Sequence, residues 1–225
     1  MATKKTGEIT IKPIKEVKYV VRIVGDTPLI MHKWSEKGKR ELLENMQHTA
    51  NGKEKDPKNP VVDFIDSMYW LTEKPDVNCY MDEEECEKLY MDAIANGARF
   101  GFPVTAFKQA AISAAYRLGW SKDKMSLRGV FFIESDEEGL VEIKSDPPIM
   151  REDITRIGMG KPDLRYRGEL RNWYADLVVK FNKNGNYDIG SIINIINAGG
   201  YVCGVGEWRP ERDGQYGMFH VETNK

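Results

Sequence analysis

Hydrophobic and polar positions alternate over several short stretches of the chain, and this alternation predicts β-strands. Between Val17 and Val24, β-branched residues dominate an alternating run that Gly25 and Asp26 end, as is typical of a strand followed by a turn. A turn-forming segment at residues 136–139 separates two further runs. The strands predicted after the first are residues 128–135, 140–145, 173–182 and 217–225.

Other stretches repeat their apolar residues at helical spacing. After Ser35, a typical N-cap, the spacing of apolar residues between Leu42 and Met46 predicts a helix. A second helix is predicted from Thr105, its expected N-cap, to Gly119. One face of this helix consists mainly of alanines, which allows another backbone to pack close to it. The remaining predicted helices are residues 81–98 and a segment that starts after Gly190-Ser191 and is closed by Gly199-Gly200.

The order of these elements predicts the fold. Strand, helix, irregular insert, helix, two strands, a long basic segment, strand, helix and strand together contain the order β-α-β-β-α-β. We therefore expect an α+β fold with a ferredoxin-like or RRM-like antiparallel sheet, helices on one face and large insertions. In this prediction residues 1–225 form a single domain with insertions at about 48–98 and 147–172.

Composition is that of a globular protein. Hydrophobic residues make up 41% and charged residues 30% of the 225 residues, which argues against a disordered chain. No apolar run approaches the roughly 18 residues of a membrane-spanning helix, and the N-terminus lacks the apolar segment of a secretory signal. We expect a cytoplasmic protein without a membrane partner. Because the formal net charge is −2, any affinity for phosphates must come from a local patch.

Sequence motifs of catalysis are missing. His32, His48 and His220 lie far apart, and the sequence has no Walker A loop, no Gly-x-Ser-x-Gly and no His-Glu-x-x-His motif. The three cysteines are not spaced as zinc ligands. The acidic run from Asp82 to Glu87 is typical of a solvated helix face. We therefore expect binding rather than catalysis, with no cofactor and no metal.

Arginines and aromatic residues gather between Arg151 and Arg171, with Tyr166 and Trp173 among them. Guanidinium groups match phosphate geometry, and aromatic faces can stack on unpaired bases. Alternatively, the acidic residues of this stretch neutralise the arginines in a surface network. The cations are Arg151, Arg156, Lys161, Arg165, Arg167 and Arg171, and the acidic residues are Glu152, Asp153, Asp163 and Glu169.

A second segment of this kind is the glycine-rich stretch at residues 204–217, GVGEWRPERDGQYG. Its glycines permit close backbone approach and positive φ angles. Trp208, Arg209, Arg212 and Tyr216 offer stacking and phosphate contacts. The alternative is a decorated β-hairpin in which Trp208 fills the core.

Three motifs carry a resemblance to a known family. The opening strand runs into Thr27-Pro28-Leu29-Ile30, the sequence FPVTAFK at residues 102–108 opens a helix, and the glycine-rich stretch follows near the C-terminus. In this order they resemble the RAMP superfamily, the RNA-recognition-motif-like subunits of CRISPR effector complexes. The chain is also similar to a group of proteins encoded by bacteriophages and prophages, with a comparable MREDITRIGMG…RYRGE…GVGEWRPE arrangement.

The resemblance implies a protein of the bacterial host cytoplasm that binds a single strand of nucleic acid, DNA or RNA, and forms a homo-oligomer along it. Two alternatives stay open: a metal-independent RAMP-type nuclease that uses His32 or Tyr216, and a phage interaction protein or inhibitor that acts on a host CRISPR or other defence complex. The expected binding residues are Lys33, Lys108, Arg117, Arg151, Arg156, Lys161, Arg165, Tyr166, Arg167, Arg171, Trp208, Arg209, Arg212 and Tyr216.

Overall fold

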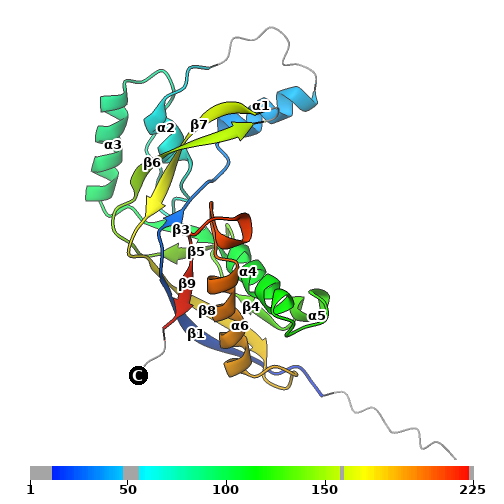
Figure 1. The fold of residues 1–225 in the computed structure, drawn as a ribbon. Coiled ribbons are helices and arrows are strands. Elements are labelled where there is room, and N and C mark those ends of the chain that lie inside the picture. Colours follow the sequence, from blue (N-terminus) through cyan, green and yellow to red (C-terminus); the bar gives the residue numbers. More distant parts are fainter. Residues whose placement is uncertain (1–11, 48–55, 158–159, 223–225) are drawn as a thin grey trace, which may run out of the picture.

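The computed structural model describes residues 12–47, 56–157 and 160–222 of the chain. It is an α+β structure with antiparallel sheets, which confirms this part of the predicted fold class. Figure 1 shows an elongated molecule, with the main sheet and the helices at residues 104–117 and 189–202 toward one end, and a β-hairpin with the helices at residues 36–46, 60–66 and 83–95 toward the other.

Four strands form the main sheet: β1 (Glu16–Gly25), β4 (Phe131–Ile133), β8 (Tyr174–Asn182) and β9 (Phe219–Val221). Their order is β4-β8-β1-β9, and every neighbouring pair is antiparallel. In β8 every second residue from Ala175 to Phe181 is buried, while the residues between them are partly exposed. The alternation in the sequence therefore corresponds to the burial of one face of the sheet.

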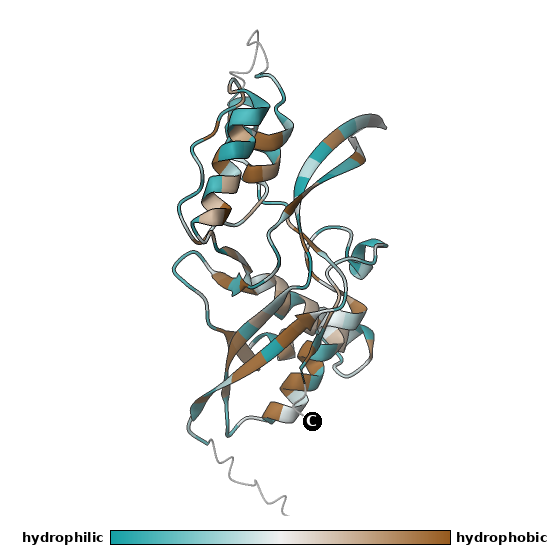
Figure 2. Cartoon of the chain, turned by 90° about the vertical axis from the view of Figure 1, so that its left-hand side faces the viewer, coloured by the Kyte–Doolittle hydropathy of each residue, from teal (hydrophilic) through white to brown (hydrophobic). Residues whose placement is uncertain are grey.

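Helices α4 (Val104–Arg117) and α6 (Ile189–Val202) pack together against that face (Figure 2). Their backbones approach closely, because a Cβ atom added to Gly199 would lie 2.7 Å from the backbone nitrogen of Ala111. A larger residue at either position would separate the helices. This confirms the prediction that the alanine face of α4 meets another backbone.

The starts of two helices can be compared with their predictions. Ser35 caps α1 (Glu36–Met46) and accepts a hydrogen bond of 3.1 Å from the Gly38 amide, as predicted. The predicted Thr105 cap of α4 is wrong, because α4 begins at Val104 after Pro103, which supplies no side-chain cap. The fixed φ of proline leads the chain into the helix one residue earlier.

The insertions form the other end of the molecule and the connection to it. The hairpin of β6 (Ile149–Ile157) and β7 (Lys161–Leu170) is joined by the short β2 (Leu29–Ile30). Within the described ranges no helix combines the length and the apolar character needed to cross a bilayer. The remaining elements are α2 (Pro60–Asp66), α3 (Glu83–Ala95), β3 (Phe100–Pro103), α5 (Met125–Arg128), β5 (Leu140–Ile143) and the 3₁₀ turn η1 (Pro210–Arg212).

Candidate functional site

One face of the β6–β7 hairpin carries charged and polar side chains along its length. Successive side chains of a strand point to opposite faces, so residues 151, 153 and 155 of β6 share a face with residues 163, 165, 167 and 169 of β7. Arg151 lies opposite Arg167, and Asp153 lies opposite Arg165. Like and unlike charges are therefore interleaved across the hairpin.

The arginines of this face are neutralised by carboxylates, as the network alternative predicts. Arg151 binds Asp153 at 2.8 Å and Glu169 at 3.0 Å, and Arg167 binds Asp153 at 3.1 Å. The two other pairs are Arg165 with Asp163 and Arg171 with Glu169, each at 2.8 Å. The aromatic partner Trp173 is also buried, and its indole N–H donates to the Thr27 carbonyl.

Burial sets the role of Arg167. Arg167 was predicted to contact a bound strand. Its exposed fraction is only 4%, so its guanidinium cannot reach a strand that lies on the surface. The prediction fails because the hairpin face turns inward at this residue, toward Asp153 and Glu207. Arg167 is therefore a structural cation of the network.

Hydrogen bonds within the network favour the charged forms of Arg151 and Asp163. Burial works to lower the pKa of Arg151, but hydrogen bonds with Glu169, Asp153 and Tyr216 outweigh it and raise that pKa. Burial works to raise the pKa of Asp163, but the hydrogen bond and charge of Arg165, together with Lys58, leave it below its ordinary value. Charged hydrogen bonds of this kind hold side chains in fixed positions.

The glycine-rich stretch forms a tightly wound loop with its tryptophan outside. Trp208 is 38% exposed and has a φ of 51°, in the left-handed region. Its carbonyl accepts the Tyr216 amide at 3.0 Å, and a Cβ added to Gly214 would overlap that carbonyl. The alternative in which Trp208 fills the core is therefore wrong. Arg209 is tied into the loop by Glu211 and by the Gly206 carbonyl.

The hairpin and this loop meet at His32. The His32 Nδ1 atom lies 3.1 Å from Glu207 Oε1 of the loop, and its Nε2 atom lies 3.2 Å from Arg165 Nη1 of the hairpin. Arg151 completes the contact, with its Cζ atom 4.6 Å from the centroid of the Tyr216 ring. The two segments singled out in the sequence are therefore neighbours in space.

Two cavities lie on either side of His32, and both include it in their walls. The first, of about 370 Å³, lies between the hairpin and the start of α1, and we call it the hairpin cavity. The second, of about 290 Å³, lies between the loop and the start of α4, and we call it the loop cavity. Lys33, Lys37, Lys58 and Arg165 line the hairpin cavity, and Tyr69, Phe102, Gln109 and Glu207 line the loop cavity.

Comparison with solved structures gives a likeness to Cmr6 from Pyrococcus furiosus. The TM-score is 0.35 and the sequence identity is 12%, over 93% of this chain and 100% of that one. No protein-family model matches the chain, and no curated protein matches it. Membership of the RAMP superfamily and a phage origin stay predictions.

Several predicted binding residues lie away from the two cavities. Lys108 reaches 3.9 Å from the centroid of the Phe132 ring, and burial lowers its pKa. It does not face the loop, because the helical stripe that lines the loop cavity passes through Ala106 and Gln109. Arg117 pairs with Glu211 at 3.3 Å. The side chains of Arg156 and Lys161 lie outside the described residues.

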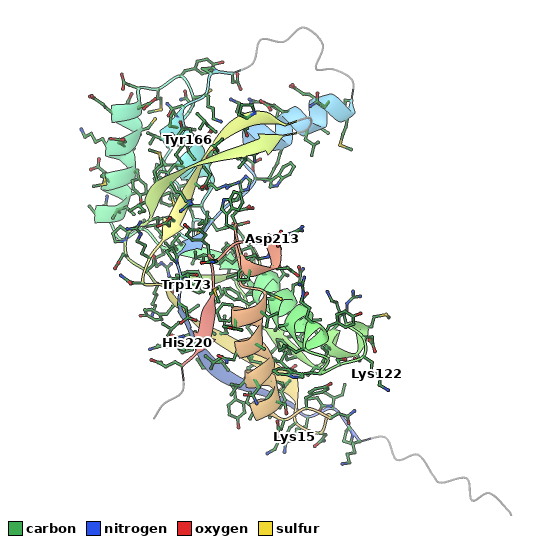
Figure 3. The ribbon with its side chains drawn as sticks, viewed as in Figure 1. Lys15, Lys122, Tyr166, Trp173, Asp213 and His220 are labelled. Atoms are coloured by element: carbon green, nitrogen blue, oxygen red, sulfur yellow. The ribbon has the colours of Figure 1, made fainter. Side chains whose placement is uncertain are left out.

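Other predicted residues do reach the junction, and the sequence missed some that matter. Lys33 and Tyr166 line the hairpin cavity, and Figure 3 shows Tyr166 on the hairpin, across from the loop that carries Asp213. Lys37 and Glu207 were not singled out. A signal for Lys37 was present, because it follows the Ser35 cap at the start of a helix. In the part of the chain that the structure describes, no three His, Cys, Asp or Glu side chains are grouped to hold a metal.

Proposed function

We propose that this protein binds single-stranded nucleic acid, DNA or RNA, at the junction of the hairpin and the glycine-rich loop. The observation that carries the proposal is the pair of adjoining cavities around His32. In the wall of the first, five lysine and arginine side chains stand beside four carboxylates, and in the wall of the second, aromatic and amide side chains stand beside Glu207, Arg209 and Glu211. Phosphates require the first kind of surface and bases the second.

The order of the strands in the main sheet supports an RRM-like domain, which suits this role. We propose a single RRM-like domain, with insertions at about 48–98 and 147–172, in which β1, α4, β4, β8, α6 and β9 form the core. The strand order β4-β8-β1-β9, antiparallel throughout, is the order that a ferredoxin-like arrangement requires. The first insertion then supplies Lys58 and Asp63, the second supplies the hairpin, and together with α1 they build the hairpin cavity.

Charge around the junction supports a phosphate contact on the α1 side. Among the described residues, neither Lys33 nor Lys37 has a carboxylate within ion-pair distance. Lys37 donates to the carbonyl oxygens of Asp56 and Pro57, each at 3.2 Å. Lys33 lies 5.9 Å from the centroid of the Tyr69 ring. The charge of these ammonium groups is not balanced by a paired carboxylate, whereas the charge of the hairpin arginines is.

The exposed Trp208 supports a base contact. It directly follows Glu207, which lines the loop cavity, and its left-handed backbone is locked by the loop. An exposed tryptophan in a strained conformation is typical of a binding residue rather than of packing. Stacking on one base is worth ~1–3 kcal/mol.

Fluorescence anisotropy with labelled single-stranded DNA, single-stranded RNA and duplex tests the proposal. We expect binding to a single strand in preference to duplex, weakened in a Lys33→Ala/Lys37→Ala variant. The matched control is Lys15→Ala/Lys122→Ala, which removes the same charge far from the junction (Figure 3). Equal loss in both double variants, or no binding by the natural protein, would contradict the proposal.

We also expect several copies to assemble along one strand. Sedimentation with oligonucleotides of increasing length tests this part, because the mass of the complex should rise in steps of one 25.8 kDa chain. A complex that keeps one chain on every length would contradict assembly without touching the binding proposal.

One observation favours a second candidate, a metal-independent ribonuclease. The His32 ring is oriented by Glu207 and lies between the two cavities, as a general base would lie beside a bound strand. Incubation with labelled RNA in the presence of a chelator distinguishes the two functions. Specific cleavage that is lost in His32→Ala would favour the enzyme, and intact RNA would favour binding alone.

A further inference from the structure

We propose that the two cavities divide one nucleotide of the bound strand between them, with its phosphate in the hairpin cavity, its base in the loop cavity and its sugar at His32. This inference rests on the proposed function and adds how the strand is held. It requires that the hairpin cavity attract an anion, that the loop cavity accept a flat heterocycle, and that no straight path join them.

The wall of the hairpin cavity carries five lysine and arginine side chains and four carboxylates, an excess of one positive charge. Three of the carboxylates are engaged in ion pairs: Asp56 with Arg40, Asp63 with Lys58, and Asp163 with Arg165 and Lys58. Lys33 and Lys37 have no such partner in the described chain. An anion at this place satisfies cations that the protein leaves unpaired.

The loop cavity suits a single base. Its volume of about 290 Å³ is at the lower end of the roughly 300–1,000 Å³ of small-ligand pockets, which favours one heterocycle over a stacked run. Tyr69 and Phe102 form an edge-to-face pair in its wall, with ring centroids 5.7 Å apart. Gln109 adds an exposed amide that can donate to and accept from a base edge.

His32 separates the two cavities and is held from both sides, by Glu207 and by Arg165. A strand that fills both cavities must therefore turn around a fixed ring. This turn withdraws one base from the stack of its neighbours, as happens to bases that enter enzyme pockets. The exposed Trp208, which follows Glu207 in the chain, can then stack on the next base.

Oligonucleotides with a single 2-aminopurine test the inference, because the fluorescence of this base rises when it leaves the stack. A set about 8 nucleotides long, within the roughly 4–16 that one domain covers, carries the probe at each position in turn. With the natural protein we expect fluorescence to rise severalfold at one or two positions, and anisotropy on the same samples to report total binding.

Two variants impair base binding in the loop cavity in different ways. Ala106→Phe fills it, and Gln109→Leu removes its exposed amide without adding bulk, which keeps the test valid if Ala106→Phe does not fold. We expect each to abolish the rise and to lower affinity about tenfold, the contribution of one base. Lys122→Phe, remote from the junction, is the control for an added ring and should change neither signal.

The outcomes separate this inference from the proposed function. Binding without a rise at any position, or a rise that survives both cavity variants, overturns the divided nucleotide and leaves the binding proposal standing. Absence of binding overturns both. A rise that persists in Lys33→Ala/Lys37→Ala at saturating protein, with weakened affinity, supports the separate roles of the two cavities.

Discussion

Removal of the Arg167 side chain should destabilise this protein far more than removal of any exposed arginine of the hairpin. Arg167 is 4% exposed and its partner Asp153 is 8% exposed, so Arg167→Ala leaves a buried carboxylate with one cation fewer. The loss of one partner of a buried pair costs about 3–5 kcal/mol. Because Asp153 keeps Arg151 at 2.8 Å, we expect the lower end, about 3 kcal/mol.

Arg171→Ala is the matched control on the same strand end. The Arg171 side chain is 59% exposed, whereas that of its partner Glu169 is 5% exposed and keeps Arg151 at 3.0 Å. Because solvent screens the Arg171 charge and Glu169 keeps a second cation, we expect a loss of about 0.2–1 kcal/mol, as for a screened pair. For a chain of this size 1 kcal/mol corresponds to about 2–4 °C in Tm. We therefore expect a decrease of about 6–12 °C for Arg167→Ala and of a few degrees at most for Arg171→Ala.

Urea unfolding followed by circular dichroism measures both free energies, and a thermal scan measures both Tm values. The double variant Arg167→Ala/Asp153→Asn completes a double-mutant cycle. Its neutral amide removes the unpaired charge and should therefore recover part of the free energy of unfolding that Arg167→Ala loses. The reasoning is refuted if Arg167→Ala and Arg171→Ala lower the free energy of unfolding equally, or if Arg167→Ala costs less than about 1 kcal/mol.

Three further predictions follow from other contacts. Gly199→Ala places a Cβ atom 2.7 Å from a backbone nitrogen of α4 and should cost about 1–3 kcal/mol by overpacking, whereas Gly129→Ala, with no atom nearby, should be neutral in the same urea titration. The hydrogen bond to His32 lowers the pKa of Glu207 below its ordinary value of 4.5. The contribution of Glu207 to stability is therefore complete above about pH 4.5 and is lost as the pH falls through its pKa in the folded protein. Glu207→Gln should flatten the acid limb of a curve of Tm against pH, and an unchanged limb would contradict this reasoning. Trp208→Gly should remove ~1–3 kcal/mol of stacking from strand binding without lowering Tm, since glycine tolerates the positive φ; a clear fall in Tm would show that the ring packs structurally.

Local patterns in the sequence were sufficient for the main elements. Burial of one face determines the alternating runs of β1 and β8 and the alanine face of α4. The spacing of apolar residues in the sequence shows which side chains are buried. The start of α4 was misplaced by one residue because Pro103 fixes its own φ regardless of the side chain that follows.

The candidate site depends on contacts between distant residues, which a single sequence does not reveal. Asp153 binds Arg167 only because the hairpin register places Arg151 opposite Arg167, and a shift by one residue would turn every charge to the other face. His32 and Glu207 are 175 residues apart in the chain. The sequence alone does not show which face of α4 lines the loop cavity. Lys108 could therefore be excluded from the strand-binding residues only from the structure.

The ion pairs also change the kind of binding to be expected from an arginine-rich hairpin. If each of the eleven cations in the predicted set contacted a phosphate, affinity would fall steeply with salt, with a slope of roughly −8 for a single strand. In the described chain the hairpin arginines are paired, and the cations in the cavity walls without a carboxylate partner are Lys33 and Lys37. About two contacts give a slope of roughly −1.4, with stacking by Trp208 carrying much of the rest. Anisotropy titrations over a range of salt concentrations distinguish the two slopes. A steep slope would mean that the hairpin network opens when the strand binds, because only then could its arginines leave Asp153, Asp163 and Glu169 for phosphates.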